Sequence, residues 1–145
     1  MATLVTGGTG FVGPNIVRVL AEKGHDVVSL DISPPDDLVR KYLAPWKDRV
    51  TWEQADILDM TALERVASDH RLDKVVHAAV YTAVREDIEK ADSRRIIDIN
   101  LNGTVNLLEM ARQAGVKRFV YVSSGGVYGE GRPPGESLKE DMPLD

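Results

Sequence analysis

The sequence predicts an α/β fold in which helices cover both faces of a parallel sheet, and three observations predict it. Short apolar segments alternate with segments of helical periodicity from the first residues onward. A glycine-rich turn joins the first apolar segment to the first helical one. The composition is globular, since 43% of the 145 residues are hydrophobic and 28% are charged. Strands that alternate with helices favour a doubly wound sheet with right-handed crossovers.

The first part of the chain supplies two strands and a helix. Apolar residues 2–6 are the first expected strand, and helical periodicity follows over residues 10–23 until Gly24 ends it. Residues 27–30 form the second expected strand. Residues 32–48 contain three prolines, so we expect a long surface connection there with about one helical turn.

The middle of the chain continues the alternation. Residues 50–53 are a weaker third strand. Thr61 and Glu64 have the spacing of a capping box, which predicts a helix that runs to about His70. Residues 74–77 are rich in β-branched side chains and are expected to form the fourth strand.

A long helix and a fifth strand complete the pattern. We expect the helix over residues 92–114, with Gly115 at its C′ position, and the strand over residues 119–122. The helix carries apolar residues along one side: Ile97, Leu101, Val105 and Leu108. Residues 125–145 are rich in glycine, proline and charge and are expected to be a loop. The doubly wound sheet is therefore expected to be truncated after its fifth strand, within a single incomplete domain over residues 1–145.

Charge and composition exclude several classes of function. The net charge of −5 offers no basic surface for nucleic acid or anionic lipid. There is no cysteine for a disulfide or a thiolate metal site, and the three histidines lack carboxylates at ligand spacing, so no metal is expected. No apolar run approaches the length of a membrane span, and no signal peptide precedes the first strand. We therefore expect a cytoplasmic protein.

The glycine-rich turn is the first candidate binding site. Two dinucleotide fingerprints overlap in residues 4–13, one starting at Gly7 and one at Gly8, and both share Gly10 and Gly13. Such glycines allow a tight turn, close approach of backbone to a diphosphate, and close packing of helix on strand. The diphosphate then lies at the positive end of the helix dipole. The alternative is a glycine turn that binds nothing.

Asp31 is the second candidate, because it ends the second expected strand 18 residues after Gly13. A carboxylate at this position accepts hydrogen bonds from an adenosine ribose. Residues 32–37 supply no Arg or Lys to neutralise a 2′-phosphate, so we expect NAD to be preferred over NADP. The alternative is that Asp31 only caps a loop.

Five segments in this order resemble the extended short-chain dehydrogenases/reductases, the NAD-dependent epimerase/dehydratase family, whose fold is a Rossmann-type sheet. They are residues 6–13, Asp56-Ile57, His77-Ala78-Ala79, residues 100–104 (Asn-Leu-Asn-Gly-Thr) and residues 123–129 (Ser-Ser-Gly-Gly-Val-Tyr-Gly). The resemblance covers nearly the whole chain but only the N-terminal half of a typical member.

The resemblance implies hydride transfer between a nicotinamide and a substrate that is often a nucleotide-linked sugar. The pyrophosphate-binding residues it implies are Gly7, Gly10, Phe11, Val12 and Gly13, with Asp31 at the ribose. Asp56 and Ile57 would flank the adenine, and Ala78, Ala79 and Asn100 would support the nicotinamide end. Ser124 matches the family's catalytic serine or threonine, which hydrogen-bonds the reacting oxygen. Pairing of the long helices in family members makes a homodimer plausible.

The family's catalytic Tyr-x-x-x-Lys pair has no match in this chain. At the fourth position after the four tyrosines, Tyr42, Tyr81, Tyr121 and Tyr128, stand Trp46, Arg85, Gly125 and Arg132. The 145 residues are therefore expected to bind cofactor but to be catalytically incomplete. The alternative function is a dinucleotide-binding or sensor module without chemistry.

Four further side chains have competing interpretations. His77 is more simply a buried, hydrogen-bonded residue than a catalytic one. Asn100 either braces backbone near the active site or makes a simple helix-to-strand hydrogen bond. Ser124 either faces the cofactor cleft or caps a strand end, and Tyr128 either lines a sugar pocket or packs on its loop.

Overall fold

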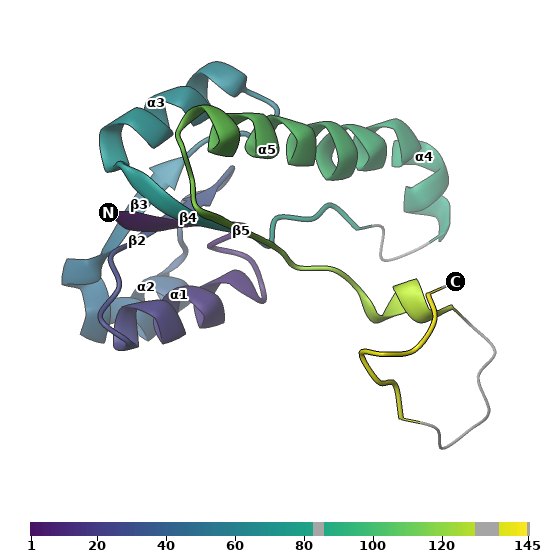
Figure 1. Ribbon diagram of the computed structural model, residues 1–145, viewed down its shortest axis with the longest axis horizontal. Coiled ribbons are helices and arrows are strands. Elements are labelled where there is room, and N and C mark those ends of the chain that lie inside the picture. The colour runs from purple at the N-terminus through teal and green to yellow at the C-terminus, as the bar shows by residue number, and fades with distance from the viewer. Residues whose placement is uncertain (83–85, 130–136, 145) are drawn as a thin grey trace.

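A computed structural model describes residues 1–82, 86–129 and 137–144, with backbone alone for residues 86–91. Five parallel strands form one sheet in the order β3-β2-β1-β4-β5, which confirms the expected doubly wound α/β fold (Figure 1). The strands are β1 (Ala2–Thr6), β2 (Val27–Asp31), β3 (Val50–Gln54), β4 (Leu72–His77) and β5 (Arg118–Tyr121). The helices are α1 (Gly13–Glu22), α2 (Asp37–Leu43), α3 (Met60–His70), α4 (Glu86–Ile97) and α5 (Gly103–Gln113). Three shorter helical segments are η1 (Ala44–Arg49), η2 (Asp98–Asn102) and η3 (Gly125–Tyr128).

Helices α1 and α2 cover one face of the sheet, and α3 and α5 cover the other (Figure 1). Strand β1 lies at the centre and is buried along its whole length. Its successive side chains alternate between the faces, so Leu4 enters the core under α3 and α5 and Val5 enters the core under α1. The strand order reverses between β1 and β4, which is where ligands bind in open α/β sheets.

The connection after β2 differs from the expected surface segment. It contains helix α2, which begins after Asp36, and then the 3₁₀ segment η1. The Asp36 side chain accepts a hydrogen bond from Val39 N at 2.8 Å, and Val39 and Leu43 are buried against the sheet. The prolines were therefore a misleading signal, because they lie before the helix and at the start of η1.

Two helix starts also differ from expectation. Helix α3 is capped by Asp59, whose carboxylate accepts from Ala62 N at 3.0 Å, so the prediction of a Thr61–Glu64 capping box is wrong. Helix α1 begins at Gly13 and not at residue 10, because the preceding residues form the glycine-rich turn. Its expected end is confirmed, with Gly24 in the left-handed conformation at φ +86°.

The long helix expected over residues 92–114 starts earlier and is interrupted. Its first part, α4, begins at Glu86, and Asp92 has non-helical backbone angles at the point where the helix was expected to start. The π-helical segment η2 then joins α4 to α5, and Gly115 follows with φ +67° as expected. Four buried residues face the sheet: Gly103, Leu107, Met110 and Ala111. The apolar side named from the sequence is instead turned to solvent.

The two edges of the sheet are finished differently. At β3, the Glu53 carboxylate accepts from His70 Nε2 at 2.8 Å and pairs with Arg65 of α3 at 3.0 Å. At β5, which spans residues 118–121 and not 119–122, Val120 and Tyr121 are 44% and 52% exposed. None of the helices that the structure describes is long and apolar enough to cross a lipid bilayer.

Candidate dinucleotide-binding site

A cavity of about 370 Å³ opens at the carboxyl ends of β1, β2 and β4, beside the reversal of strand order. It is lined by ten of the eleven residues that the sequence suggested for a cofactor: Gly7, Gly10, Phe11, Val12, Gly13, Asp31, Asp56, Ile57, Ala78 and Ala79. The eleventh, Asn100, is not among the lining residues. Lining residues that the sequence analysis missed are Leu30, Ile32, Leu58, Val80, Tyr81, Arg95, Asp98 and Ile99.

The glycine-rich turn has the geometry that a diphosphate requires. Gly7 is left-handed at φ +69°, and a Cβ on Gly13 would overlap the carbonyl oxygen of Gly7. These two glycines are therefore needed to fold the turn itself. A Cβ on Gly10 would meet only the Gly7 oxygen, at 3.4 Å, so Gly10 leaves open space on the cavity side. That open space allows a ligand to approach the backbone.

The amino end of α1 is free to bind an anion. No described side chain caps it, and Pro14 occupies its first turn, where a missing N–H costs little. Phe11 and Val12 precede the helix on the cavity wall and are 95% and 48% exposed. Unpaired N–H groups and the helix dipole both favour a negatively charged ligand here, so the residues present fit a dinucleotide diphosphate.

Asp31 both lines the cavity and caps the neighbouring turn. Its Oδ2 accepts from Thr9 N at 3.1 Å, and its Oδ1 is 3.5 Å from Ser33 N. An ionised carboxylate has about four lone-pair positions, so it can still accept from the hydroxyls of a ribose. Arg40 donates to Pro35 O at 3.1 Å and is not part of the cavity lining, so its guanidinium does not pair with Asp31 there.

The side of the cavity formed by residues after β3 is held by helix α5. Asp56 Oδ1 accepts from Leu58 N at 2.9 Å, which shapes the segment. Asn106 of α5 donates to the carbonyl oxygens of Ile57 and Leu58 at 3.1 and 3.3 Å. Gly103 allows the close packing of Ile57, whose Cδ1 would be 2.5 Å from a Cβ there. The wall expected to flank an adenine is therefore fixed from behind.

The loop after β4 lies directly against the glycine-rich turn. A Cβ on Gly7 would be 2.8 Å from both Cα and N of Ala79, so the two walls touch. Asn100 holds this loop from the other side, because its Oδ1 accepts from Tyr81 N and its Nδ2 donates to Tyr81 O, both at 2.8 Å. Of its two interpretations, Asn100 thus braces loop backbone and does not bond to a strand.

Tyr81 and Arg95 form part of the rim of the cavity. The Tyr81 hydroxyl donates to Asp92 Oδ2 at 2.7 Å, and this hydrogen bond raises the pKa of Tyr81. The Arg95 guanidinium lies over the Tyr81 ring, with Cζ 5.0 Å from the ring centre. Their positions depend on the kink at Asp92 and on η2, which the sequence periodicity does not indicate.

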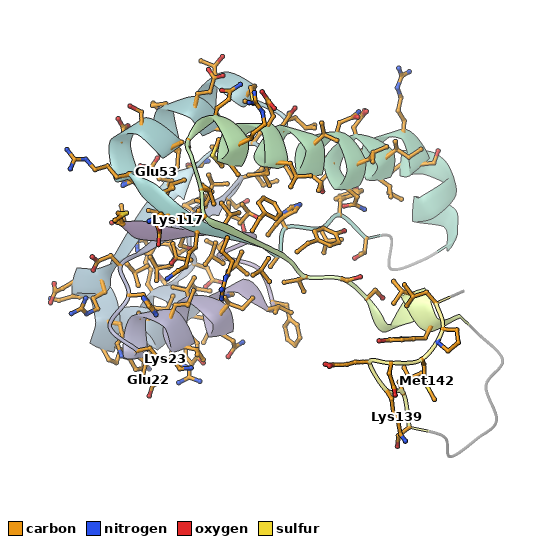
Figure 2. All side chains as sticks on the ribbon, viewed as in Figure 1. Glu22, Lys23, Glu53, Lys117, Lys139 and Met142 are labelled. Atoms are coloured by element: carbon orange, nitrogen blue, oxygen red, sulfur yellow. The ribbon has the colours of Figure 1, made fainter. Side chains whose placement is uncertain are left out.

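Ser124 lies outside the described cavity lining. Its Oγ accepts from Gly126 N at 3.2 Å and caps η3, in the segment that leaves the sheet beyond β5 (Figure 1). Further along this segment, Lys139 N donates to Met142 Sδ at 3.4 Å in a turn that lies apart from the layers (Figure 2). The role of Ser124 toward a substrate stays a prediction.

Other parts of the described surface offer less chemistry. A larger hollow of about 790 Å³ lies at the amino ends of the strands and includes Arg71, Asp73 and Lys117. None of the predicted site residues lines it. Among the described residues, no group of three His, Asp or Glu side chains could hold a metal ion.

Comparison with known sequences places the chain in a family. The model of the NAD dependent epimerase/dehydratase family matches residues 3–145. The UDP-glucose 4-epimerase of Neisseria meningitidis serogroup A is 37% identical over 144 residues, which are 97% of this chain and 41% of the relative. That of Mycolicibacterium smegmatis is 36% identical over 146 residues, covering 100% of this chain and 45% of the relative. The chain thus spans less than half the length of these relatives.

Solved structures agree with the sequence comparison. The UDP-glucose 4-epimerase of Thermus thermophilus in complex with NAD superposes with a TM-score of 0.81 and 34% identity, over 100% of this chain and 44% of that one. The enzyme of Bifidobacterium longum in complex with NAD⁺ and UDP gives 0.84 and 30%, over 100% and 43%. The chain described here belongs to the NAD dependent epimerase/dehydratase family.

Proposed function

We propose that these 145 residues are the NAD-binding portion of an oxidoreductase that epimerises a UDP-linked sugar by hydride transfer. The observation that carries the proposal is the single cavity that brings the glycine-rich turn, Asp31 and the loop after β4 together. The relatives named above are UDP-glucose 4-epimerases, which favours this activity over a dehydratase or a simple dehydrogenase.

Each wall of the cavity has one part in holding the cofactor. The turn containing Gly10 and the amino end of α1 bind the diphosphate, and Asp31 accepts from the adenosine ribose. The segment Asp56–Ile57 flanks the adenine, and Ala78 and Ala79 lie at the nicotinamide end. The negative charge of Asp31 disfavours a 2′-phosphate, so NAD binds more tightly than NADP.

Bound NAD supplies a centre that accepts a hydride from the sugar and returns it. Ser124 hydrogen-bonds the reacting oxygen of the sugar. A general base is still needed, and none of the four tyrosines of this chain has a lysine at the fourth following position. Under this proposal the general base lies in a region that corresponds to the part of the relatives not covered by these 145 residues.

The exposed side of the long helix is the proposed contact between two copies of the protein. Ile97, Leu101, Val105 and Leu108 are 57%, 59%, 54% and 48% exposed and recur at helical spacing. A row of half-exposed apolar side chains is a feature of interaction surfaces. Leu101→Lys should weaken self-association in sedimentation experiments and leave the folded state intact. An unchanged association constant would contradict this contact.

Binding and turnover measurements on the purified chain test the proposal. We expect saturable NAD binding and no interconversion of UDP-glucose and UDP-galactose. Enzyme-like turnover by these 145 residues would contradict catalytic incompleteness. If a gene that continues past residue 145 lacks a Tyr-x-x-x-Lys pair downstream, a non-catalytic dinucleotide sensor becomes the better description.

A further inference from the structure

His77 ends β4, which lies beside the central strand β1, and it stands one residue before the loop that lines the cavity. It is 1% exposed and pairs in register with Thr6, the last residue of β1. Its ring contacts Thr6 Oγ1 through Nδ1 at 2.7 Å and Thr104 Oγ1 through Nε2 at 2.9 Å. Because His77 is not among the lining residues, any effect on a ligand must pass through its neighbours.

The hydrogen-bond partners determine which ring nitrogen carries the proton. The Thr104 hydroxyl donates its one proton to the carbonyl oxygen of Asn100 at 2.6 Å, so it can only accept from Nε2. Nε2 is therefore protonated, and in a neutral ring Nδ1 is an acceptor. Thr6 Oγ1 accepts from Ala79 N at 3.3 Å and has its own proton free to donate to Nδ1. The tautomer protonated on Nε2 thus gives every donor and acceptor in this series of hydrogen bonds a partner.

This chain of hydrogen bonds begins and ends at the same cavity wall. It starts at Ala79 N, passes through His77, and reaches the carbonyl of Asn100, whose side chain holds the backbone of Tyr81. Both Ala79 and Tyr81 belong to the loop that touches Gly7. A displacement of any group in this chain of hydrogen bonds therefore changes how the loop packs against the glycine-rich turn.

We propose that His77, as a neutral imidazole protonated on Nε2, is a positioning residue that aligns the loop after β4 with the glycine-rich turn. A proton on Nδ1 would turn Thr6 Oγ1 from donor to acceptor toward the ring, leave the Thr6 hydroxyl proton without this partner, and so disturb the geometry of the hydrogen bond from Ala79 N. Among the described residues, the ring hydrogen-bonds to Thr6 and Thr104 and lies against the rings of Phe119 and Tyr121; Tyr121 is the titratable residue of the four, and none is an Asp, Glu, Lys or Arg. Burial lowers the pKa of His77 to about 4, which keeps the ring neutral under ordinary conditions.

The consequence for NAD affinity rests on the proposed function, so the test separates the two claims. The direct measurement is ¹⁵N NMR of the histidine ring in the ligand-free chain, which distinguishes the tautomers. We expect the neutral form protonated on Nε2 from pH 7 down to pH 5. A ring protonated on Nδ1, or a charged ring at pH 6, would overturn the proposal.

The matched variants are Thr104→Val and Thr104→Ser, because Thr104 lies outside the cavity lining. Thr104→Val keeps the side-chain shape and removes the hydroxyl; we expect it to shift the Ala79 amide resonance and weaken NAD binding about tenfold. Thr104→Ser keeps the hydroxyl and should bind NAD within about twofold of the wild type. Equal affinity and an unmoved Ala79 resonance in Thr104→Val would overturn the role of His77.

If Thr104→Val fails to fold, two variants of His77 itself test the two sides of the hydrogen-bond network separately. His77→Gln can keep a donor toward Thr104, and His77→Asn can keep an acceptor toward Thr6. Each should displace the Ala79 resonance less than His77→Leu, which keeps neither, and equal displacement in all three would overturn the proposal. A wild-type chain that does not bind NAD contradicts the proposed function alone, since the resonance measurements still decide the role of His77.

Discussion

Polar side chains around the cavity are held by hydrogen bonds, whereas the outer side of the long helix exposes apolar side chains. Around the cavity, the side chains of His77 and Asn100 are hydrogen-bonded on both of their polar atoms, and Asp31 holds the neighbouring turn. On the outer side of the helix, Leu101 and Val105 are more than half exposed. This comparison indicates that hydrogen bonds among the described residues organise the cavity, whereas the helix presents apolar surface that is available to a further contact.

Adjacent leucines of α5 give the sharpest test of this comparison. Leu107 is fully buried between α5 and the sheet, and Leu108 is 48% exposed. Leu107→Ala should lower the free energy of unfolding by about 4 kcal/mol through lost burial and a cavity. Leu108→Ala should change it by less than about 0.5 kcal/mol in the monomer. Urea denaturation at low protein concentration measures both, and similar losses would break the distinction between the two sides.

Two glycines of the turn separate folding from ligand approach. Gly13→Ala should cost about 3 kcal/mol of stability, because its Cβ would overlap backbone atoms of Gly7 and Gly8. Gly10→Ala should cost less than about 1 kcal/mol but weaken NAD binding, since its Cβ would occupy the open space above the turn. Thermal unfolding with and without NAD distinguishes them. If Gly10→Ala binds NAD normally, the diphosphate does not lie over that residue.

Acid should lower the stability of the folded chain through protonation of His77. Its pKa is about 4 in the folded chain because of burial, against 6.5 for the free side chain. Between these values the unfolded chain binds more protons, so stability falls as pH drops from about 6.5 to about 4, and His77 contributes about 2–3 kcal/mol of the loss. Urea denaturation across this range should show a shallower slope for His77→Gln. A slope for His77→Gln equal to that of the wild type would contradict this role of His77.

Replacement of Asp31 should have a selective effect on dinucleotide binding. Asp31→Ala should weaken the binding free energy of NAD by about 1–2 kcal/mol, because a carboxylate that accepts from the ribose is lost. The binding of NADP should weaken by less. Asp31→Asn retains an acceptor for Thr9 N and isolates the contribution of charge. Calorimetric titration with both dinucleotides gives the preference ratio. A ratio unchanged in both variants would leave Asp31 as a loop cap.

The strands and the glycine-rich turn could be predicted because their signals are local. Gly13 must be glycine for the turn to close, and each apolar run ends within one residue of the end of its strand. Helix α2 was expected only as about one helical turn because prolines dominated its surroundings, although Asp36 followed by Val39 and Leu43 carries a capping and burial signal for a longer helix. At α3, Thr61 gave a valid capping pattern, but Asp59 lies two residues earlier and takes that role.

Long-range geometry explains the rest of what the sequence did not predict. Helix α5 is apolar on both sides, so periodicity could not decide whether Leu107 or Leu108 faces the sheet. Tyr81 and Arg95 reach the cavity only because α4 is kinked at Asp92 and joined to α5 by a π-helical segment. Interruptions of this kind often accompany functional sites, but they leave no periodic signal in the sequence.

Mapping NAD onto the backbone amides of the chain by NMR titration tests the central claim most directly. We predict saturable shifts at Gly10, Phe11, Asp31 and Ala79, with the amides of Val105 and Leu108 unmoved. Saturating NAD should also stabilise the fold, by about 2.7 kcal/mol at a concentration one hundred times its Kd. Absence of shifts at millimolar NAD, or shifts confined to the hollow around Arg71 and Lys117, would contradict the assignment of the cavity.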